Sequence, residues 1–174
     1  MQLFIHNRCI TSKIMKYITL TFLLSLTLST CFGQEGDFFN QEVKKHFLIV
    51  YSTKDYSTAL EKANSISEDL KLKLDLRKLL RNDDDLGLTW EKTDCEGNGW
   101  EYPCYIPRGR YDDGEYVSVE WSNGYQGFSE GYYVVIISSQ FEYNEKIKTL
   151  LNKTKEFVPS AYVKSSLIYM GCMH

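Results

Sequence analysis

The chain has 174 residues, of which 43% are hydrophobic and 25% are charged, and this ordinary globular composition excludes disorder over most of its length. Its formal net charge of −3 argues against a protein that binds nucleic acid by neutralising phosphates. At this length we expect one domain, with or without a tail. Aromatic residues make up 14% of the chain, which is a high share.

The first 33 residues have the organisation of a secretory signal. Basic residues without acidic ones precede an apolar stretch over 18–28, which is too short to span a membrane, and small residues follow it. We therefore predict a signal peptide over residues 1–33 and an exported protein, periplasmic or extracellular. Met15 begins such a signal more naturally than Met1, so two start positions stay open.

The cleavage point of this signal has two interpretations. Cleavage after Gly33 would release a soluble protein. The segment 28–31 instead resembles a lipobox, in which Cys31 would carry a lipid and hold the protein at the membrane. Thr30 stands where Gly, Ala or Ser is usual in a lipobox, and this favours soluble export.

Export places the cysteines in an oxidising compartment. Cys95 and Cys104 flank a segment rich in Gly, Asn and Pro, which are turn-forming residues. We predict a disulfide between these two cysteines. Cys172 is then left over, either buried and unpaired or taking one of the other two as its partner.

The first half of the mature chain has the pattern strand, helix, strand. The continuous apolar run 47–51 predicts a buried strand. Asp55 or Ser57 can cap a following helix, and the apolar spacing over 59–70 predicts an amphipathic helix. Leucines alternate with charged residues over 72–76, which is the period of a half-exposed strand.

The second half repeats this pattern after an irregular stretch. Residues 116–121 alternate as a strand does, and 132–137 form a second continuous apolar run. Asn144 is a candidate helix cap, and the apolar spacing over 147–157 predicts another amphipathic helix. A last β-like segment covers 161–169.

The similarity of the halves predicts an α+β fold. We expect a ferredoxin-like β-α-β unit repeated twice, which forms an antiparallel sheet with two helices on one face. The evenly apolar first strand of each half should lie in the centre of the sheet. This domain would cover residues 46–174, behind a polar linker over 34–45, with a long insertion over 79–130 between the repeats.

Both halves resemble the SPOR (sporulation-related repeat) family, which is built from two short β-α repeats. The matching stretches are 46–77 and 131–164, of which the second matches better. The chain departs from the family at Tyr51 and Ile137, where the family often has Gly, and in the length of its insertion. The resemblance implies an exported domain that binds the glycan strands of peptidoglycan on its sheet face, without catalytic residues.

The residues of the insertion suit glycan binding. Aromatic rings pack against the C–H faces of sugars, and arginines pair with carboxylates on muramic acid or stem peptides. The candidate glycan-binding residues are Trp100, Tyr102, Tyr105, Arg108, Arg110 and Trp121. The alternative is that these aromatic residues form a small core of their own beneath the disulfide loop.

Other functions have weaker signals. The mature chain has no Gly-x-Ser-x-Gly motif and only His46 and His174 as histidines, so we expect no enzyme and no cofactor. Asp83–Asp85 is better explained as a solvated acidic turn than as a calcium site. The main alternative function is a protein–protein interaction module of the envelope, which includes a homodimer formed through an exposed sheet face.

Overall fold

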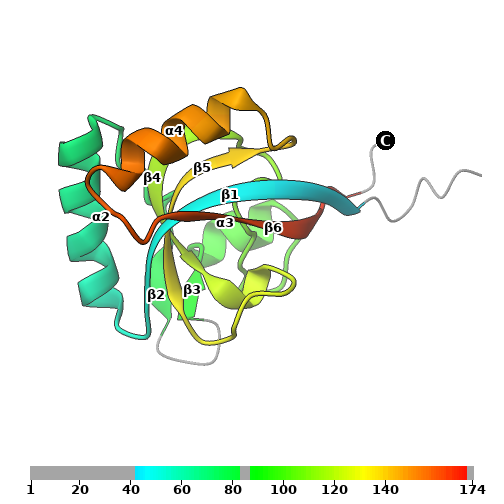
Figure 1. Cartoon of the computed structure of the whole chain (residues 1–174). Coiled ribbons are helices and arrows are strands. Elements are labelled where there is room, and N and C mark those ends of the chain that lie inside the picture. The colour runs from blue at the N-terminus through cyan, green and yellow to red at the C-terminus, as the bar shows by residue number, and fades with distance from the viewer. Residues whose placement is uncertain (1–41, 83–86, 172–174) are drawn as a thin grey trace, which may run out of the picture. The chain divides into compact units, whose positions relative to one another are not determined.

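The computed structural model describes residues 42–82 and 87–171 (Figure 1). The described residues belong to the unit Phe39–His174 of the chain. The predicted signal peptide with Cys31, the acidic turn 83–85 and Cys172 lie outside the described residues. No helix within the described ranges is long and apolar enough to cross a membrane.

The domain is α+β, with one four-stranded and one two-stranded antiparallel sheet. The strands are β1 (Glu42–Thr53), β2 (Leu80–Asn82), β3 (Gly87–Thr89), β4 (Gly114–Trp121), β5 (Tyr133–Gln140) and β6 (Tyr162–Tyr169). The helices are α2 (Tyr56–Leu70), α3 (Lys92–Gly97) and α4 (Glu145–Lys155), with a 3-10 turn, η1, at Ser122–Gly124. The larger sheet has the order β4-β5-β1-β6, and β2 pairs with β3.

The two most apolar strands lie in the centre of the sheet, as the sequence predicted. β1 and β5 are neighbours, and each has a second strand on its other side. Residues Phe47–Val50 of β1 and Tyr133–Ser139 of β5 are all buried. Such strands must be apolar on both sides because both faces of the sheet are covered.

Helices α2 and α4 cover one face of the sheet (Figure 1). Their buried side chains form one apolar cluster with the strand residues that point toward them. The members from the helices are Ala59, Ala63, Ile66, Leu70 and Ile147, and those from β1, β4 and β5 include Leu48, Val50, Val117, Val119, Val135 and Ile137. Full burial of one such large side chain contributes about 1.5–3 kcal/mol.

Asp55, rather than Ser57, caps α2. Its carboxylate accepts hydrogen bonds from the backbone N–H of Thr58 and from the hydroxyls of Ser57 and Thr58. Asn144 caps α4 in the same way, by accepting from the N–H groups of Lys146 and Ile147. These side chains satisfy N–H groups that the first turn of a helix leaves without partners.

The strand predicted over residues 72–76 does not form. This segment makes a single parallel bridge, from Leu74 to Val117 of β4, and β4 takes the place beside β5. β4 supplies eight residues that alternate between the two faces, so it buries more side chains there than the shorter leucine segment could. The predicted insertion thus provides a strand of the sheet, and the double β-α-β repeat is not reproduced in the predicted form.

β1 begins at Glu42, inside the predicted linker. Its charged start suggested a solvated segment, but Lys45 is fully buried. The ammonium group of Lys45 pairs with Asp113 and lies 3.1 Å from the centre of the Phe141 ring. A long basic side chain can be buried at its apolar stem when its charged end finds a partner.

A buried ion pair holds the insertion to the other face of the sheet. Glu120 of β4 is fully buried, and its Oε2 lies 2.8 Å from Nη1 of Arg77. The same oxygen accepts hydrogen bonds from the hydroxyls of Tyr105, at 2.7 Å, and Tyr125, at 3.2 Å. Burial and the charge of Glu120 raise the pKa of both tyrosines well above the usual value of 10, so both remain donors.

Arg77 adopts a backbone conformation that L-residues rarely take. Arg77 and Lys78 have φ angles of 57° and 56°, in the left-handed region. The side chain of Arg77 also lies 2.7 Å from Asp112 through Nε and donates to the carbonyl of Ile106. Burial alone would lower the pKa of Arg77, but Glu120 and its neighbours raise it above its usual value. These contacts offset the backbone strain, which costs on the order of 1–3 kcal/mol per residue.

Removal of the buried charge should destabilise the fold. We expect Glu120→Gln to lower the free energy of unfolding by about 3 kcal/mol at pH 7, because Arg77 then loses one of its two carboxylates in a buried site. The control is Glu96→Gln, whose partner Lys92 lies on the exposed surface of α3. This control should cost less than about 0.5 kcal/mol. Urea unfolding measures both, and equal midpoints for the two variants would contradict the structural role of Glu120.

The cap of α2 should make stability depend on pH. Its hydrogen bonds lower the pKa of Asp55 to about 2, against roughly 3.9 in an unfolded chain. Its contribution is therefore present above pH 4 and is lost as pH falls toward 2. Asp55→Asn keeps a capping oxygen that does not titrate. The wild type should lose stability relative to this variant between pH 5 and pH 2, as measured by thermal unfolding. An NMR titration midpoint near 4 for Asp55 would contradict this prediction.

Candidate functional site

A groove opens on the sheet face opposite α2 and α4. It has a volume of about 260 Å³ and is lined by Ser52, Ser122, Phe128, Ser129, Tyr132, Val134, Tyr162 and Lys164. Val134 belongs to the second apolar cluster, together with Phe47 and Ile168. We call this site the sheet-face groove. Its residues come from β1, β5, β6 and the loop that follows β4.

The loop after β4 forms a fixed wall of the groove. The hydroxyl oxygen of Ser122 accepts from the N–H of Tyr132, and Asn123 accepts from the N–H of Gly131. Phe128 stacks on Tyr125 at 5.1 Å between ring centres. Because Tyr125 donates to Glu120, the wall is tied to the buried ion pair.

Two lysines give the groove a positive rim. Lys164 Nζ lies 4.7 Å from the centre of the Phe128 ring, and Lys54 Nζ lies 5.4 Å from that of Tyr132. Within residues 42–82 and 87–171, neither ammonium group has a carboxylate at ion-pair distance. The half-exposed Tyr162 completes the rim, and partial burial raises its pKa, so its hydroxyl stays protonated at neutral pH.

Arg108, a predicted glycan-binding residue, lies inside the domain. It is fully buried, and its guanidinium donates to Ser118 Oγ and to the carbonyls of Tyr116, Gly114 and Ile136. In this position it cannot reach a glycan at the surface, so this prediction is corrected. Arg108 instead joins the loop before β4 to the strands β4 and β5.

Tyr105 and Trp121 are also structural in this arrangement. The Tyr105 hydroxyl donates to Glu120 and accepts from the N–H of Trp121. Trp121 is 9% exposed, and its ring packs against Tyr133 at 4.9 Å. Both side chains pack into the main apolar cluster, so they neither form a small core of their own beneath the disulfide loop nor present their rings to a ligand.

Three predicted residues remain at the surface. Tyr102 is exposed in the disulfide loop. Trp100 and Arg110 lie together, with the guanidinium carbon of Arg110 4.9 Å from the Trp100 ring centre. Tyr111 and Tyr169 lie at similar distances from the same guanidinium. We call Trp100, Arg110, Tyr111 and Tyr169 the aromatic–arginine cluster.

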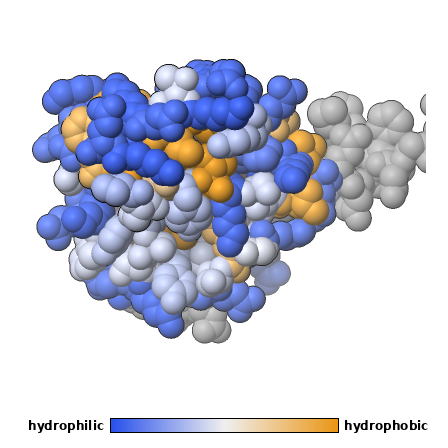
Figure 2. All heavy atoms as spheres, viewed as in Figure 1, coloured by the Kyte–Doolittle hydropathy of each residue, from blue (hydrophilic) through white to orange (hydrophobic). Residues whose placement is uncertain are grey.

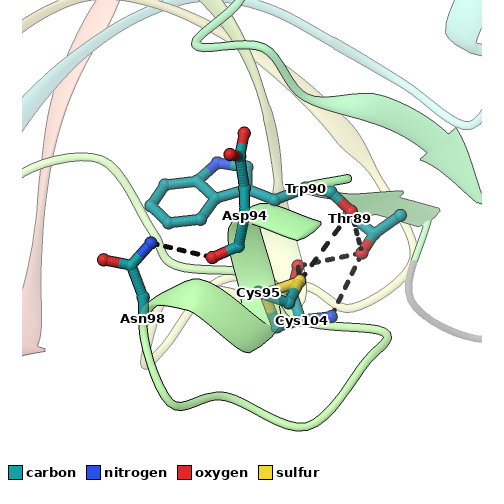
Figure 3. The surroundings of a disulfide bond; sticks show 6 residues. All are labelled: Thr89, Trp90, Asp94, Cys95, Asn98 and Cys104. Atoms are coloured by element: carbon teal, nitrogen blue, oxygen red, sulfur yellow. Dashed lines mark hydrogen bonds between the residues drawn. A yellow bond between two sulfur atoms is a disulfide. The ribbon is translucent and has the colours of Figure 1, made fainter. Parts of the chain in front are cut away.

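The predicted disulfide between Cys95 and Cys104 is confirmed (Figure 3). Cys95 and Cys104 are bonded, with their Cα atoms 5.9 Å apart. The N–H of Trp100 donates to the carbonyl of Cys95, and that of Trp90 donates to the carbonyl of Cys104. Thr89 also donates to the Cys104 carbonyl and accepts from its N–H, so the bridge joins α3 to the end of β3.

Sequence reasoning missed the groove and half of the cluster. Tyr132, Tyr162 and Lys164 have the sequence pattern of ordinary strand residues. The neighbouring sequence does not show that β5, β6 and the loop after β4 come together in the fold. Tyr169 is far from Arg110 in the sequence, and only the sheet topology brings them together. Tyr111 is 67% exposed, and its position beside Arg110 was the one local signal.

Comparisons with protein-family models, curated proteins and solved structures found no match to this chain. The resemblance to the SPOR family gains no support from them. In the described part of the chain, no three His, Cys, Asp or Glu side chains gather in a way that could hold a metal ion.

Removal of the disulfide should destabilise the domain. For the double variant Cys95→Ala/Cys104→Ala we expect a loss of about 2–3 kcal/mol in the free energy of unfolding, because a loop of ten residues regains its freedom in the unfolded chain. Denaturant unfolding under non-reducing conditions measures this loss. If the wild type unfolds at the same denaturant concentration with and without reductant, the bridge contributes nothing to stability and this prediction is wrong.

Proposed function

We propose that this protein is an exported domain that binds a cell-envelope glycan, peptidoglycan above all, in the sheet-face groove, without turnover. The observation that carries the proposal is the composition of the groove. Aromatic rings, serine hydroxyls and Lys164 line one concave site, Lys54 lies beside its Tyr132 ring, and neither lysine has a carboxylate partner among the described residues.

The groove suits the chemistry of sugars. Pyranose rings present C–H faces that pack on aromatic rings such as Tyr132 and Tyr162, and their hydroxyl groups exchange hydrogen bonds with the exposed Ser52 and Ser129. Peptidoglycan also carries carboxylates, on muramic acid and on its peptides. Lys164 at the rim can pair with such a group by a charge-assisted hydrogen bond.

The proposal includes binding without catalysis. The groove is lined by serines, aromatic residues, one valine and one lysine, so its lining supplies no carboxylate or imidazole for acid–base chemistry. Cleavage of a glycosidic bond usually needs a pair of carboxylic groups on opposite sides of the bond. A domain of this kind would hold the glycan and leave its bonds intact.

Export is part of the same proposal. The signal-like first 33 residues and the buried disulfide both fit an oxidising compartment. We also propose that the sheet derives from two β-α-β halves. In this view β4, from the insertion, separates β5 from the segment 72–76, which keeps one bridge to β4 at Leu74. The SPOR-like pattern would then survive in the central strands and the two helices.

A second candidate function is protein–protein interaction through the edge strand β6. Tyr162, Leu167 and Tyr169 of this strand are exposed, and β6 is the last strand of its sheet. Figure 2 shows hydrophobic residues at the surface between α4 and the strands β1 and β6, with hydrophilic residues around them. A second copy of the chain is one partner that such an edge could bind. Light scattering at increasing protein concentration tests for this homodimer.

Binding to isolated peptidoglycan tests the proposed function. We expect the wild type to sediment with purified sacculi, and the double variant Tyr162→Ala/Lys164→Ala to bind about 10- to 100-fold more weakly. Each charge-assisted hydrogen bond or ring contact contributes roughly 1–3 kcal/mol. The matched control is Tyr143→Ala/Lys153→Ala, which removes an exposed tyrosine and an exposed lysine elsewhere.

The control variant should bind as the wild type does, and circular dichroism should show that both variants are folded. Binding of wild type and groove variant with equal affinity would exclude the groove as the site. Absence of wild-type binding to sacculi would exclude the proposed function.

A further inference from the structure

Arg110 carries a charge that the described part of the protein does not balance. Its guanidinium group lies 4.9, 5.0 and 5.1 Å from the ring centres of Trp100, Tyr111 and Tyr169. No hydrogen bond or ion pair joins this group to any residue within 42–82 or 87–171, and its Nε is buried without a partner. A partly desolvated charge without a counter-ion is costly, so an anion delivered by a ligand would be favoured here.

The acidic residues that follow Arg110 are turned toward other cations. Asp112 lies 2.7 Å from Arg77, and Asp113 pairs with the buried Lys45. Neither carboxylate is therefore available to Arg110. The five N–H donors of a guanidinium lie in its plane, and they match the two oxygens of a carboxylate or phosphate.

The cluster is held in place before any ligand arrives. The disulfide and the hydrogen bond from Trp100 to Cys95 position one ring. Gly171 fits closely against Arg110, because a Cβ atom there would lie 2.7 Å from Nη2, and its φ of 84° also favours glycine. Groups fixed in this way lose little freedom on binding, and this increases affinity.

The cluster and the groove lie near opposite ends of one strand. Tyr162 and Lys164 of β6 belong to the groove, and Tyr169 of β6 belongs to the cluster. Lys164 and Tyr169 are five residues apart, which corresponds to roughly 17 Å along a strand, and their side chains leave opposite faces of it because successive strand residues alternate. One ligand could therefore reach both sites only if it is extended and passes around the edge of β6, which is the last strand of its sheet.

We infer that the aromatic–arginine cluster is an oxyanion-binding subsite, and that the ligand is a linear acidic glycan of several sugar units that passes around the edge strand β6. This inference rests on the proposed function and specifies its ligand. Arg110 binds a carboxylate or phosphate of the polymer, while the groove holds a sugar ring further along. Two linked contacts raise the affinity for long chains far above that for short ones.

A series of defined glycans tests this inference. The probes are a muropeptide disaccharide, long peptidoglycan glycan strands, the same strands with their carboxylates amidated, and a teichoic acid as a phosphate polymer. Calorimetry measures each probe against the wild type, Arg110→Gln and Arg110→Lys. Tyr111→Ala, which changes a mostly exposed side chain, is a second variant for the case that Arg110→Gln does not fold.

We expect the wild type to bind long acidic strands at least tenfold more tightly than the disaccharide or the amidated strands. Arg110→Gln should remove this tenfold gain and leave disaccharide binding unchanged, whereas Arg110→Lys should keep part of it. Tyr111→Ala should reduce the gain about threefold or more. Arg110-dependent binding of teichoic acid alone would support the oxyanion subsite and identify phosphate as the source.

If the wild type and Arg110→Gln bind every probe with equal affinity, the inference is wrong. Binding of the disaccharide in that case would still support the proposed function. Equal affinity of the wild type for short, long and amidated glycans would overturn the inference as well. If the wild type binds no probe at all, both the inference and the proposed function fail.

Discussion

The buried ion pair between Arg77 and Glu120 is the interaction on which the rest of the domain depends. It joins the segment after α2 to β4, and the hydroxyls of Tyr105 and Tyr125 add two further parts of the chain to the same carboxylate oxygen. A charge in such a site is tolerated only when partners surround it. The long segment between α2 and β5 is therefore held to the sheet and is not a loose loop.

Both the sheet-face groove and the aromatic–arginine cluster are connected to this pair. Tyr125 supports Phe128, which forms the wall of the groove. Asp112 pairs with Arg77, and no carboxylate within residues 42–82 and 87–171 forms an ion pair with the guanidinium of Arg110 in the aromatic–arginine cluster. The pairing of Asp112 with Arg77 and of Asp113 with Lys45 thus leaves Arg110 without either of these carboxylates.

The sequence was informative where the signal is local. The apolar runs identified β1 and β5, Asn144 was recognised as a cap, and the turn-forming residues between Cys95 and Cys104 indicated their bridge. It failed where a residue's environment depends on distant parts of the chain. Arg108 and Arg110 are alike and two positions apart, yet Arg108 is fully buried and donates to three backbone carbonyls, whereas the guanidinium of Arg110 lies among three aromatic rings. No periodicity distinguishes them, and none shows that β4 would displace the segment 72–76.

β1 and β6, the first and last described strands along the chain, are neighbours in the sheet. In the pairing of β1 with β6, Glu42 lies directly opposite Tyr169. A connection of a few residues between these positions would leave every strand neighbour unchanged, and new termini could be placed at Pro159 and Ser160, an exposed pair between α4 and β6. The order of the strands along the chain could therefore be changed without a change in how they pair, and the domain is suited to circular permutation.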